Sequence, residues 1–316
     1  MRGATALGYG LCVQHDPVPM TQAPASLADL RRRLDAIDDR LLDQLMERAR
    51  AMEDVRAAKA AEEKSADAAR SPQLARPGRE LSILRRLVAR VQGPLPPGLV
   101  VRLWRDIMTS FTRLQGAFSV VVLDAADDER GKSPPRLTGL AHRHYGQATP
   151  LLTASSPAQL IARLDDGRAQ LGLLPTPEDT PDLNWWRNLA PSGLQVLARL
   201  PIDGRETQPG AFVVGRQSFE ESGADRGLLV VAPDIEASRA KLMRLLTEAG
   251  LRPVGIIAET TVGGRPIFLM VNEFYVAADD ARLANLADTG LRTIVAGGYG
   301  VPLGLALDQP LKGVPA

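Results

Sequence analysis

The most regular hydrophobic pattern in the chain runs from Leu27 to Lys59, where apolar residues recur at intervals of three and four. This spacing is typical of one face of an α-helix. Ser26 precedes the run as a candidate N-cap, with Asp29 at the third helical position. Because the run contains no proline or glycine, we predict one helix on the order of 50 Å long. A helix of this length usually packs against a partner chain.

Two cations interrupt this apolar stripe, whose members are Leu27, Leu30, Leu34, Ile37, Leu41, Leu45, Met52 and Val55. Arg48 fills the single opening in the stripe, and Lys59 occupies its next position. Burying an uncompensated cation costs several kcal/mol. One interpretation is a pair of salt bridges to nearby acids that lie off the stripe, namely Glu47, Glu53 or Asp54. The interpretation that we favour is a cationic pocket in a helical bundle, shaped for a small polyanion.

Two shorter helices are predicted after a polar linker broken by proline and glycine. The first runs from about Arg79 to Val91, with Glu80 on the inward face formed by Ile83, Leu84, Leu87 and Val91. The second ends before Gly116, and its apolar stripe comprises Leu103, Trp104, Ile107, Met108, Phe111 and Leu114. Gln115 follows Phe111 by four residues, so we expect it to face the bundle as well.

The composition changes after Gly116, where short strand-like runs begin to alternate with helical ones. We expect an α/β domain over 117–225. Residues 226–305 then give the order βαββαβ, which is typical of the ferredoxin-like plait. The predicted fold class is therefore multidomain α plus α/β, with a three-helix domain over 26–116, a disordered extension over 1–25 and a tail over 306–316.

Bulk properties narrow the function classes. A formal net charge of +1 on 316 residues gives no electrostatic footprint for nucleic acid. The single cysteine, Cys12, excludes an intrachain disulfide, and the histidines show no metal-binding pattern, so we expect no metal. Residues 1–25 lack the apolar run of a secretory signal, and Met20 is an alternative start. We expect a cytoplasmic protein with no membrane association.

The polar residues of the helical domain suit restraint of a dianion rather than hydrolysis. They comprise cations, one amide and one carboxylate, without a nucleophile beside a base or a phosphate-binding glycine loop. Arg31 belongs to the first helix too, but it precedes Arg48 by 17 residues, roughly 25 Å along the axis. Only an antiparallel second copy of the helix could bring the two residues together, which predicts a homodimer with shared sites if Arg31 is functional.

Residues 26–116 resemble the all-helical class of chorismate mutases, as found at the front of bifunctional mutase–prephenate dehydratases. The resemblance rests on "LRRRLDAIDDRLLDQLMERARAMEDVRAAK", "RPGRELSILRRL" and "LWRDIMTSFTRLQ". It implies an intertwined dimer that converts the dianion chorismate to prephenate by a [3,3] rearrangement, without a covalent intermediate or a cofactor. Such an enzyme serves phenylalanine and tyrosine biosynthesis.

The resemblance also implies a role for each site residue. Arg48 and a partner chain's Arg31 would hold the two carboxylates, and Lys59 and Gln115 would donate to the ether oxygen. Glu80 would meet the ring hydroxyl, and Arg79 would assist binding. Two departures from the family pattern concern the pocket, since Arg76 replaces an acid of some members and Phe111 replaces a small residue. The linker between Lys59 and Arg79 is also longer than usual.

The second half resembles a diverged prephenate dehydratase domain followed by an ACT-type domain. The dehydratase signature Thr-Arg-Phe should fall at Gly210, Ala211 and Phe212, where only the phenylalanine is kept. The ACT signature should fall near Glu259, where the chain reads "AETT". We therefore favour a chorismate mutase without dehydratase activity. The alternatives are a bifunctional mutase–dehydratase and a non-catalytic, amino-acid-binding regulator that keeps a relic mutase domain.

Overall fold

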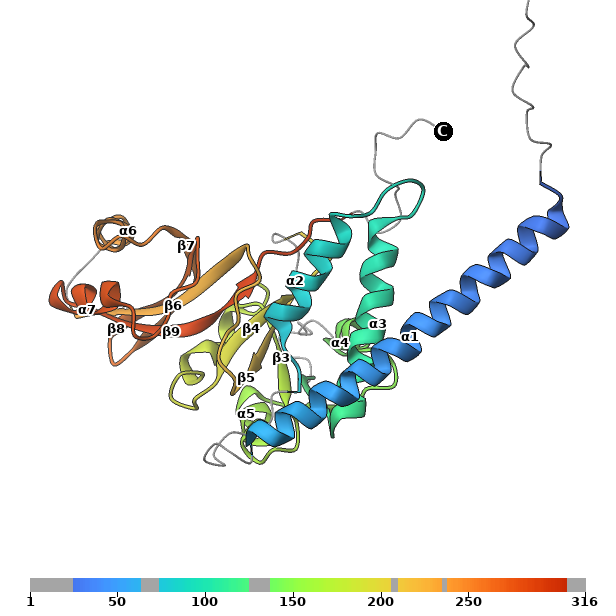
Figure 1. Cartoon of the computed structure of the whole chain (residues 1–316). Helices are drawn as coiled ribbons and strands as arrows, with labels where there is room; N and C mark the ends of the chain where they lie inside the picture. The colour runs from blue at the N-terminus through green and yellow to red at the C-terminus, as the bar shows by residue number, and fades with distance from the viewer. Residues whose placement is uncertain (1–24, 64–73, 125–136, 206–209, 235–237, 306–316) are drawn as a thin grey trace, which may run out of the picture. The chain divides into compact units, whose positions relative to one another are not determined.

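The computed structural model of the chain describes residues 25–63, 74–124, 137–205, 210–234 and 238–305 (Figure 1). The chain forms two compact units, Met1–Ala58 and Lys59–Ala316. The predicted extension over 1–25 lies outside the described residues except for residue 25, as do the alternative start at Met20 and the predicted tail over 306–316.

Helix α1 (Leu27–Glu63) confirms the prediction of one long N-terminal helix. Ser26 Oγ accepts a hydrogen bond from the Asp29 backbone N–H at 3.2 Å, and the Ser26 N–H donates to Asp29 Oδ2 at 3.3 Å. These reciprocal bonds form a capping box, which satisfies backbone donors of the first turn. The stripe residues of α1 are largely exposed, including Leu27 at 63% and Leu34 at 60%. The single chain therefore does not bury the face that we expected to be buried.

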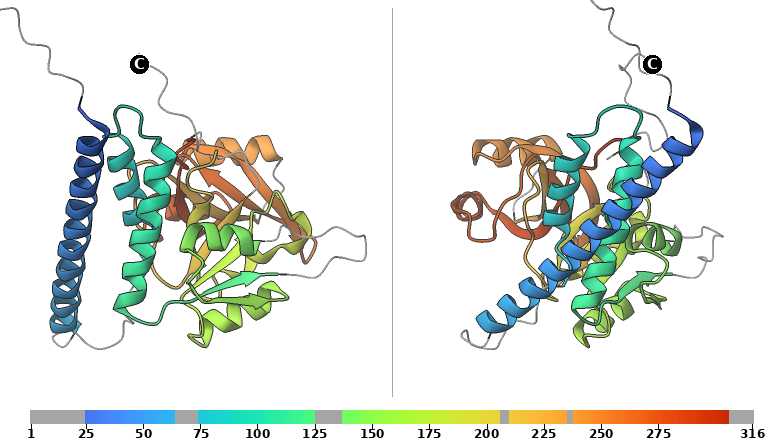
Figure 2. Two further views of the ribbon diagram at one scale, coloured as in Figure 1. Left: turned by 90° about the vertical axis from the view of Figure 1, so that its right-hand side faces the viewer. Right: turned by 45° about the vertical axis from the view of Figure 1, so that its right-hand side comes forward.

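Helices α2 (Pro77–Val88) and α3 (Pro97–Gln115) pack against each other in the second unit, and Figure 2 shows them side by side. Helix α2 begins two residues earlier than predicted because Pro77 lies in its first turn, where a missing N–H costs nothing. It also ends earlier, since the N–H of Ala89 bonds to the Arg85 carbonyl and closes the last turn. The prediction that Val91 belongs to the inward face of this helix was therefore wrong.

The buried face of α3 differs from the predicted one. Of the six apolar residues expected to face inward, Met108 is buried, whereas Leu103 and Leu114 are 48% and 71% exposed. The buried residues of α3 include Val101, Arg105, Thr109 and Thr112. Since α3 packs against α2 and α4 (Leu137–Tyr145), this partly polar face joins the helices to the α/β region, and the predicted apolar face stays open.

The described strands are β1 (Val120–Leu123), β2 (Leu151–Ala154), β3 (Leu171–Pro175), β4 (Gln195–Leu200), β5 (Ala211–Gly215), β6 (Asp225–Pro233), β7 (Pro253–Val262), β8 (Arg265–Asn272) and β9 (Leu291–Gly300). They form one nine-stranded mixed sheet in the order β2-β1-β3-β5-β4-β9-β6-β8-β7. Strand β1 is parallel to β2 and β3, β5 is antiparallel to β3 and β4, and β4 meets β9 in parallel at Val196 and Gly297.

Side chains that alternate along β1 belong to two different hydrophobic cores, one on each face of the sheet. Val121 and Leu123 of β1 join a cluster with α5 (Pro157–Asp165) and Trp185, whereas Val120 and Val122 join a cluster with α2, α3 and α4. Successive side chains of a strand point to opposite faces, so β1 is buried on both. Helices α2 and α3 thus share a core with the α/β region.

The C-terminal segment confirms the predicted βαββαβ order. It runs β6, α6 (Arg239–Glu248), β7, β8, α7 (Ala281–Asp288), β9, and its strands lie in the order β9-β6-β8-β7 with antiparallel pairs throughout. Leu242 of α6 and Leu286 of α7 belong to one core cluster with these strands. This is the ferredoxin-like plait. The ACT-type identity of the plait stays a prediction.

Candidate functional site

The first helix carries three of the predicted site residues. Arg31 is exposed and Arg48 is half-buried, and burial lowers the pKa of the Arg48 guanidinium. Both lie on the continuous α1, so their separation of roughly 25 Å along the axis holds in the structure. Lys59 continues the backbone of α1, and its side chain lies outside the described residues.

The second unit carries the other three predicted residues. Arg79 and Glu80 lie in the first turn of α2, where Arg79 is exposed and Glu80 is half-buried. Gln115 is the last residue of α3, and its Nε2 donates to the Phe111 carbonyl of the same helix at 3.3 Å. Glu80 lines a small cavity that Gln115 does not line. Arg79 and Glu80 are neighbours on one turn of α2, whereas Gln115 lies on the other helix of the pair.

The polar partner of Glu80 is a residue that the sequence reasoning missed. Arg105 of α3 is 4% exposed, and its Nη1 donates to Glu80 Oε2. Its Nε donates to the His144 carbonyl of α4 at 3.1 Å, and its Nη2 to Thr109 Oγ1 at 3.4 Å. A sequence signal existed, because Arg105 shares a face of α3 with Val101, Met108 and Thr112 at intervals of three and four. The same reasoning that identified Arg48 applies to it.

Burial and the Arg105 charge both act on the titratable groups around Arg105. Burial, and then the Arg105 guanidinium, hold the pKa of His144 well below its ordinary value, so His144 is neutral at pH 7. The Arg105 guanidinium carbon lies 5.7 Å from the ring centre of Tyr145, and burial raises the pKa of that phenol. In the cluster of Glu80, Arg105, His144 and Tyr145, Glu80 therefore balances the buried positive charge of Arg105 beside neutral aromatic groups.

The cavity beside this cluster is too small for an organic substrate. Glu80, Arg105, His144 and Arg199 are among its lining residues, and its volume is about 10 Å³. A volume of about 10–15 Å³ is the least that holds one water molecule. The interior side of Glu80 is thus packed.

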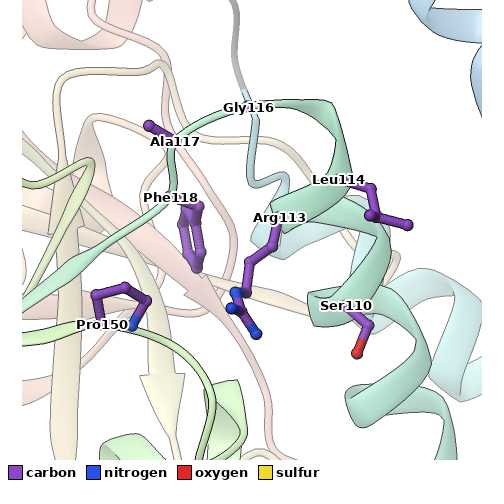
Figure 3. Close-up of a pocket in the computed structure, with 7 residues that line it drawn as sticks. All are labelled: Ser110, Arg113, Leu114, Gly116, Ala117, Phe118 and Pro150. Atoms are coloured by element: carbon purple, nitrogen blue, oxygen red, sulfur yellow. The ribbon is translucent and has the colours of Figure 1, made fainter.

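A larger pocket lies at the C-terminal end of α3 (Figure 3). It measures about 470 Å³, and the Arg113 side chain extends toward Phe118 across it. Its other lining residues are Ser110, Leu114, Gly116, Ala117 and Pro150. None of the predicted site residues lines it, so we do not assign it to the candidate site.

The two pocket residues that depart from the family pattern, Arg76 and Phe111, are both in contact with other residues of the structure. Arg76 forms an ion pair with Glu220, and Phe111 is half-buried. Ala211 and Phe212 of β5 are fully buried, and the Phe212 ring lies 5.4 Å from that of Tyr299. The one residue kept from the dehydratase signature is therefore a core residue.

Among the described residues no cluster of candidate metal ligands occurs, and no described helix is long and apolar enough to cross a membrane.

Comparison with known proteins agrees with the resemblance seen in the sequence. Residues 30–116 match the family described as chorismate mutase type II. The bifunctional chorismate mutase/prephenate dehydratase of Pseudomonas aeruginosa is 28% identical over 154 residues, which are 49% of this chain and 40% of that protein. The chain thus spans about two fifths of that relative's length. The match over residues 30–116 confirms the resemblance of this segment to the chorismate mutase family.

Solved structures are similar to part of the chain. Prephenate dehydratase from Streptococcus mutans matches with a TM-score of 0.41 and 15% identity, covering 58% of this chain and 99% of that one. GqqA, described as a novel type of quorum quenching acylase, matches with a TM-score of 0.42 and 18% identity, covering 58% of this chain and 95% of that one.

Proposed function

We propose that this protein is a chorismate mutase that converts chorismate to prephenate. The observation that carries the proposal is the match of residues 30–116 to the chorismate mutase type II family, together with the presence in this segment of the six polar residues that the resemblance implies. Those residues are Arg31, Arg48, Lys59, Arg79, Glu80 and Gln115.

The proposed chemistry is a rearrangement that needs restraint and charge stabilisation rather than a covalent intermediate. Arg48 and the partner subunit's Arg31 bind the two carboxylates and hold the flexible dianion in a reactive shape. Lys59 and Gln115 donate to the ether oxygen, where negative charge develops as its bond to the ring breaks. Glu80 accepts from the ring hydroxyl, and Arg79 assists binding.

A homodimer with shared sites is part of the proposal. Arg31 and Arg48 of one α1 lie roughly 25 Å apart, so one small ligand cannot contact both. The apolar stripe of α1 is largely exposed, including Leu41 at 59% and Val55 at 44%. A second α1 running antiparallel would cover this stripe and place each Arg31 beside the Arg48 of the other chain.

Prephenate dehydratase activity is the second candidate, because the relative from Pseudomonas aeruginosa is named as bifunctional. We favour the mutase alone. Gly210 and Ala211 replace the Thr-Arg of the signature, and the following Phe212 is fully buried. A non-catalytic regulator is the third candidate, but such a protein would gain stability by replacing the unused half-buried cation Arg48 with an apolar residue.

One assay separates the three candidates. Purified full-length protein is incubated with chorismate, with and without phenylalanine and tyrosine, and chorismate, prephenate and phenylpyruvate are separated by chromatography at neutral pH. We expect chorismate to be replaced by an equal amount of prephenate. Phenylpyruvate formed faster than in an enzyme-free control would establish the bifunctional enzyme. Unchanged chorismate, together with binding of either amino acid, would establish the regulator.

A further inference from the structure

The Glu80 carboxylate is held from within the protein by the buried cation Arg105. Glu80 lies in the first turn of α2, and the Nη1 of Arg105 on α3 donates to its Oε2. The Arg105 side chain is 5% exposed and that of Glu80 is 15% exposed. A charge-assisted contact of this kind is short and directional. It therefore fixes one of the two carboxylate oxygens.

Arg105 is itself fixed by groups on two other sides. Its Nε donates to the His144 carbonyl at 3.1 Å, and its Nη2 donates to Thr109 Oγ1 at 3.4 Å. All three nitrogens of the guanidinium therefore have acceptors, which leaves this side chain a single orientation. His144 belongs to α4, beyond the segment that matches the chorismate mutase family. The α/β region thus supplies part of the support for Glu80.

This arrangement leaves Glu80 able to accept a further hydrogen bond. An ionised carboxylate has about four acceptor positions on two oxygens, and Arg105 occupies one position on Oε2. No other described side chain donates a hydrogen bond to the Glu80 carboxylate. The remaining oxygen, Oε1, is available to a hydroxyl that approaches from outside the packed cavity.

We infer that Arg105 is a positioning residue for the mutase reaction, which orients Glu80 Oε1 to accept the ring hydroxyl of chorismate. The inference rests on the proposed function. It also gives the second half of the chain a role in the mutase, since the His144 carbonyl holds the guanidinium that holds Glu80. The competing explanation is that the Glu80–Arg105 pair only docks α2 and α3 on the α/β region.

Substrate discrimination separates these explanations. The kcat/KM of the full-length protein is measured for chorismate and for an analogue in which hydrogen replaces the ring hydroxyl. For the wild type we expect discrimination in favour of chorismate on the order of tenfold or more, as for a hydrogen bond to a charged group. Glu80→Ala should reduce this discrimination to about one. Arg105→Gln should reduce it nearly as far, and combining the two substitutions should lower it no further.

Arg85→Gln is the matched control. The Arg85 Nη2 donates to the carbonyls of Ala224 and Val301, so this arginine also docks α2 on the α/β region, but it does not contact Glu80. We expect this variant to keep the wild-type discrimination, whatever its effect on stability. Circular dichroism and thermal unfolding establish that each variant is folded before it is assayed.

Three results would overturn the inference or its premise. Wild-type discrimination in folded Arg105→Gln, with both substrates slowed equally, would show that the residue is only a docking contact. If Arg105→Gln does not fold, Arg105→Lys replaces it, since it keeps the charge but cannot reach all three acceptors. We then expect intermediate discrimination, and wild-type discrimination would again overturn the inference. Absence of chorismate turnover in the wild type would instead overturn the proposed function.

Discussion

Arg76 and Glu220 lie 144 residues apart in the chain, yet both Nε and Nη2 of the arginine lie 2.7 Å from the same carboxylate oxygen, Oε1. Arg76 is the N-cap residue of α2, and Gln217 of the same loop donates to the Ala75 carbonyl at 2.9 Å. These contacts fix the start of α2 on the loop that precedes β6. Glu80 lies one turn further along, so the loop also determines where this candidate site residue sits.

Replacing Gly78 should destabilise the second unit. A Cβ at this position would lie 1.9 Å from the Glu220 carbonyl oxygen, and a backbone atom cannot move aside as a side chain can. We expect Gly78→Ala to lower the free energy of unfolding by about 1–3 kcal/mol, as for overpacked sites. Urea denaturation followed by tryptophan fluorescence measures the change.

Gly139→Ala is the control for that substitution. Gly139 lies within α4, and a Cβ there would meet no atom within 4 Å. Alanine in a helix is more stable than glycine by roughly 0.5–1 kcal/mol, so this variant should gain stability. An unchanged stability of Gly78→Ala would contradict the close contact between α2 and the Glu220 backbone.

Removing either cation of the α1 stripe should abolish most mutase turnover. For Arg48→Ala and Lys59→Ala we expect kcat/KM for chorismate to fall about 10²–10³-fold, as when a preorganised donor is lost. Arg50→Ala is the control, because Arg50 is exposed on another face of the same helix and should leave turnover unchanged. Near-normal turnover of either stripe variant at saturating chorismate would show that the site is assigned to the wrong residues.

The neutral amide of Gln115 should give the wild type a broad pH profile through neutrality, because an amide donates its hydrogen bond without titrating. In Gln115→Glu the new carboxyl has to be protonated to donate to the ether oxygen. The activity of this variant should therefore fall as pH rises above the pKa of the new group, which is about 4.3 in an unperturbed glutamate. An unchanged profile in the variant would show that residue 115 does not contact the breaking bond.

Subunit mixing tests the shared site. Arg31→Ala and Arg48→Ala homodimers should each be inactive, since every site carries one lesion. After joint denaturation and refolding, a heterodimer contains one doubly altered site and one intact site. Random pairing puts about half of the chains in heterodimers, so the mixture should regain roughly a quarter of wild-type activity. If activity stays at the parental level after subunit exchange has been verified, the site is built within one chain.

The N-cap of α7 should stabilise the plait in a pH-dependent way. Asp280 accepts from the Arg282 N–H at 2.9 Å, and the Arg282 side chain lowers the pKa of this carboxyl to about 2. Its folded pKa lies below the unfolded value of about 3.9, so the stabilisation is present above pH 4 and is lost as pH falls toward 2. Asp280→Ala should cost about 0.5–2 kcal/mol at pH 7. Denaturation from pH 7 to pH 2 should show this difference shrinking, and a constant difference would contradict the linkage.

Long elements with a regular hydrophobic period were predictable because the period is contained within their own stretch of sequence. The run from Leu27 to Lys59 repeats often enough to specify one helix, and the capping residues beside it agree with that assignment. Helix α4 and strand β2 were not predicted, because nine and four residues carry too little periodicity to stand out from loop sequence. The order of elements in the plait was predicted, whereas the single nine-stranded sheet was not, since strand pairing joins residues far apart in sequence.

The sequence by itself determined the long capped helix, the βαββαβ order and the set of polar residues that makes chorismate the proposed substrate. Only the tertiary structure decided which face of α3 is buried and that Arg105, rather than solvent, faces Glu80. The reason is physical. Helical periodicity reports which residues share a face, but α3 has two such faces, and burial depends on α4, which meets Arg105 through a carbonyl 39 residues away. A contact of that separation depends on how whole elements pack, and no local pattern records it.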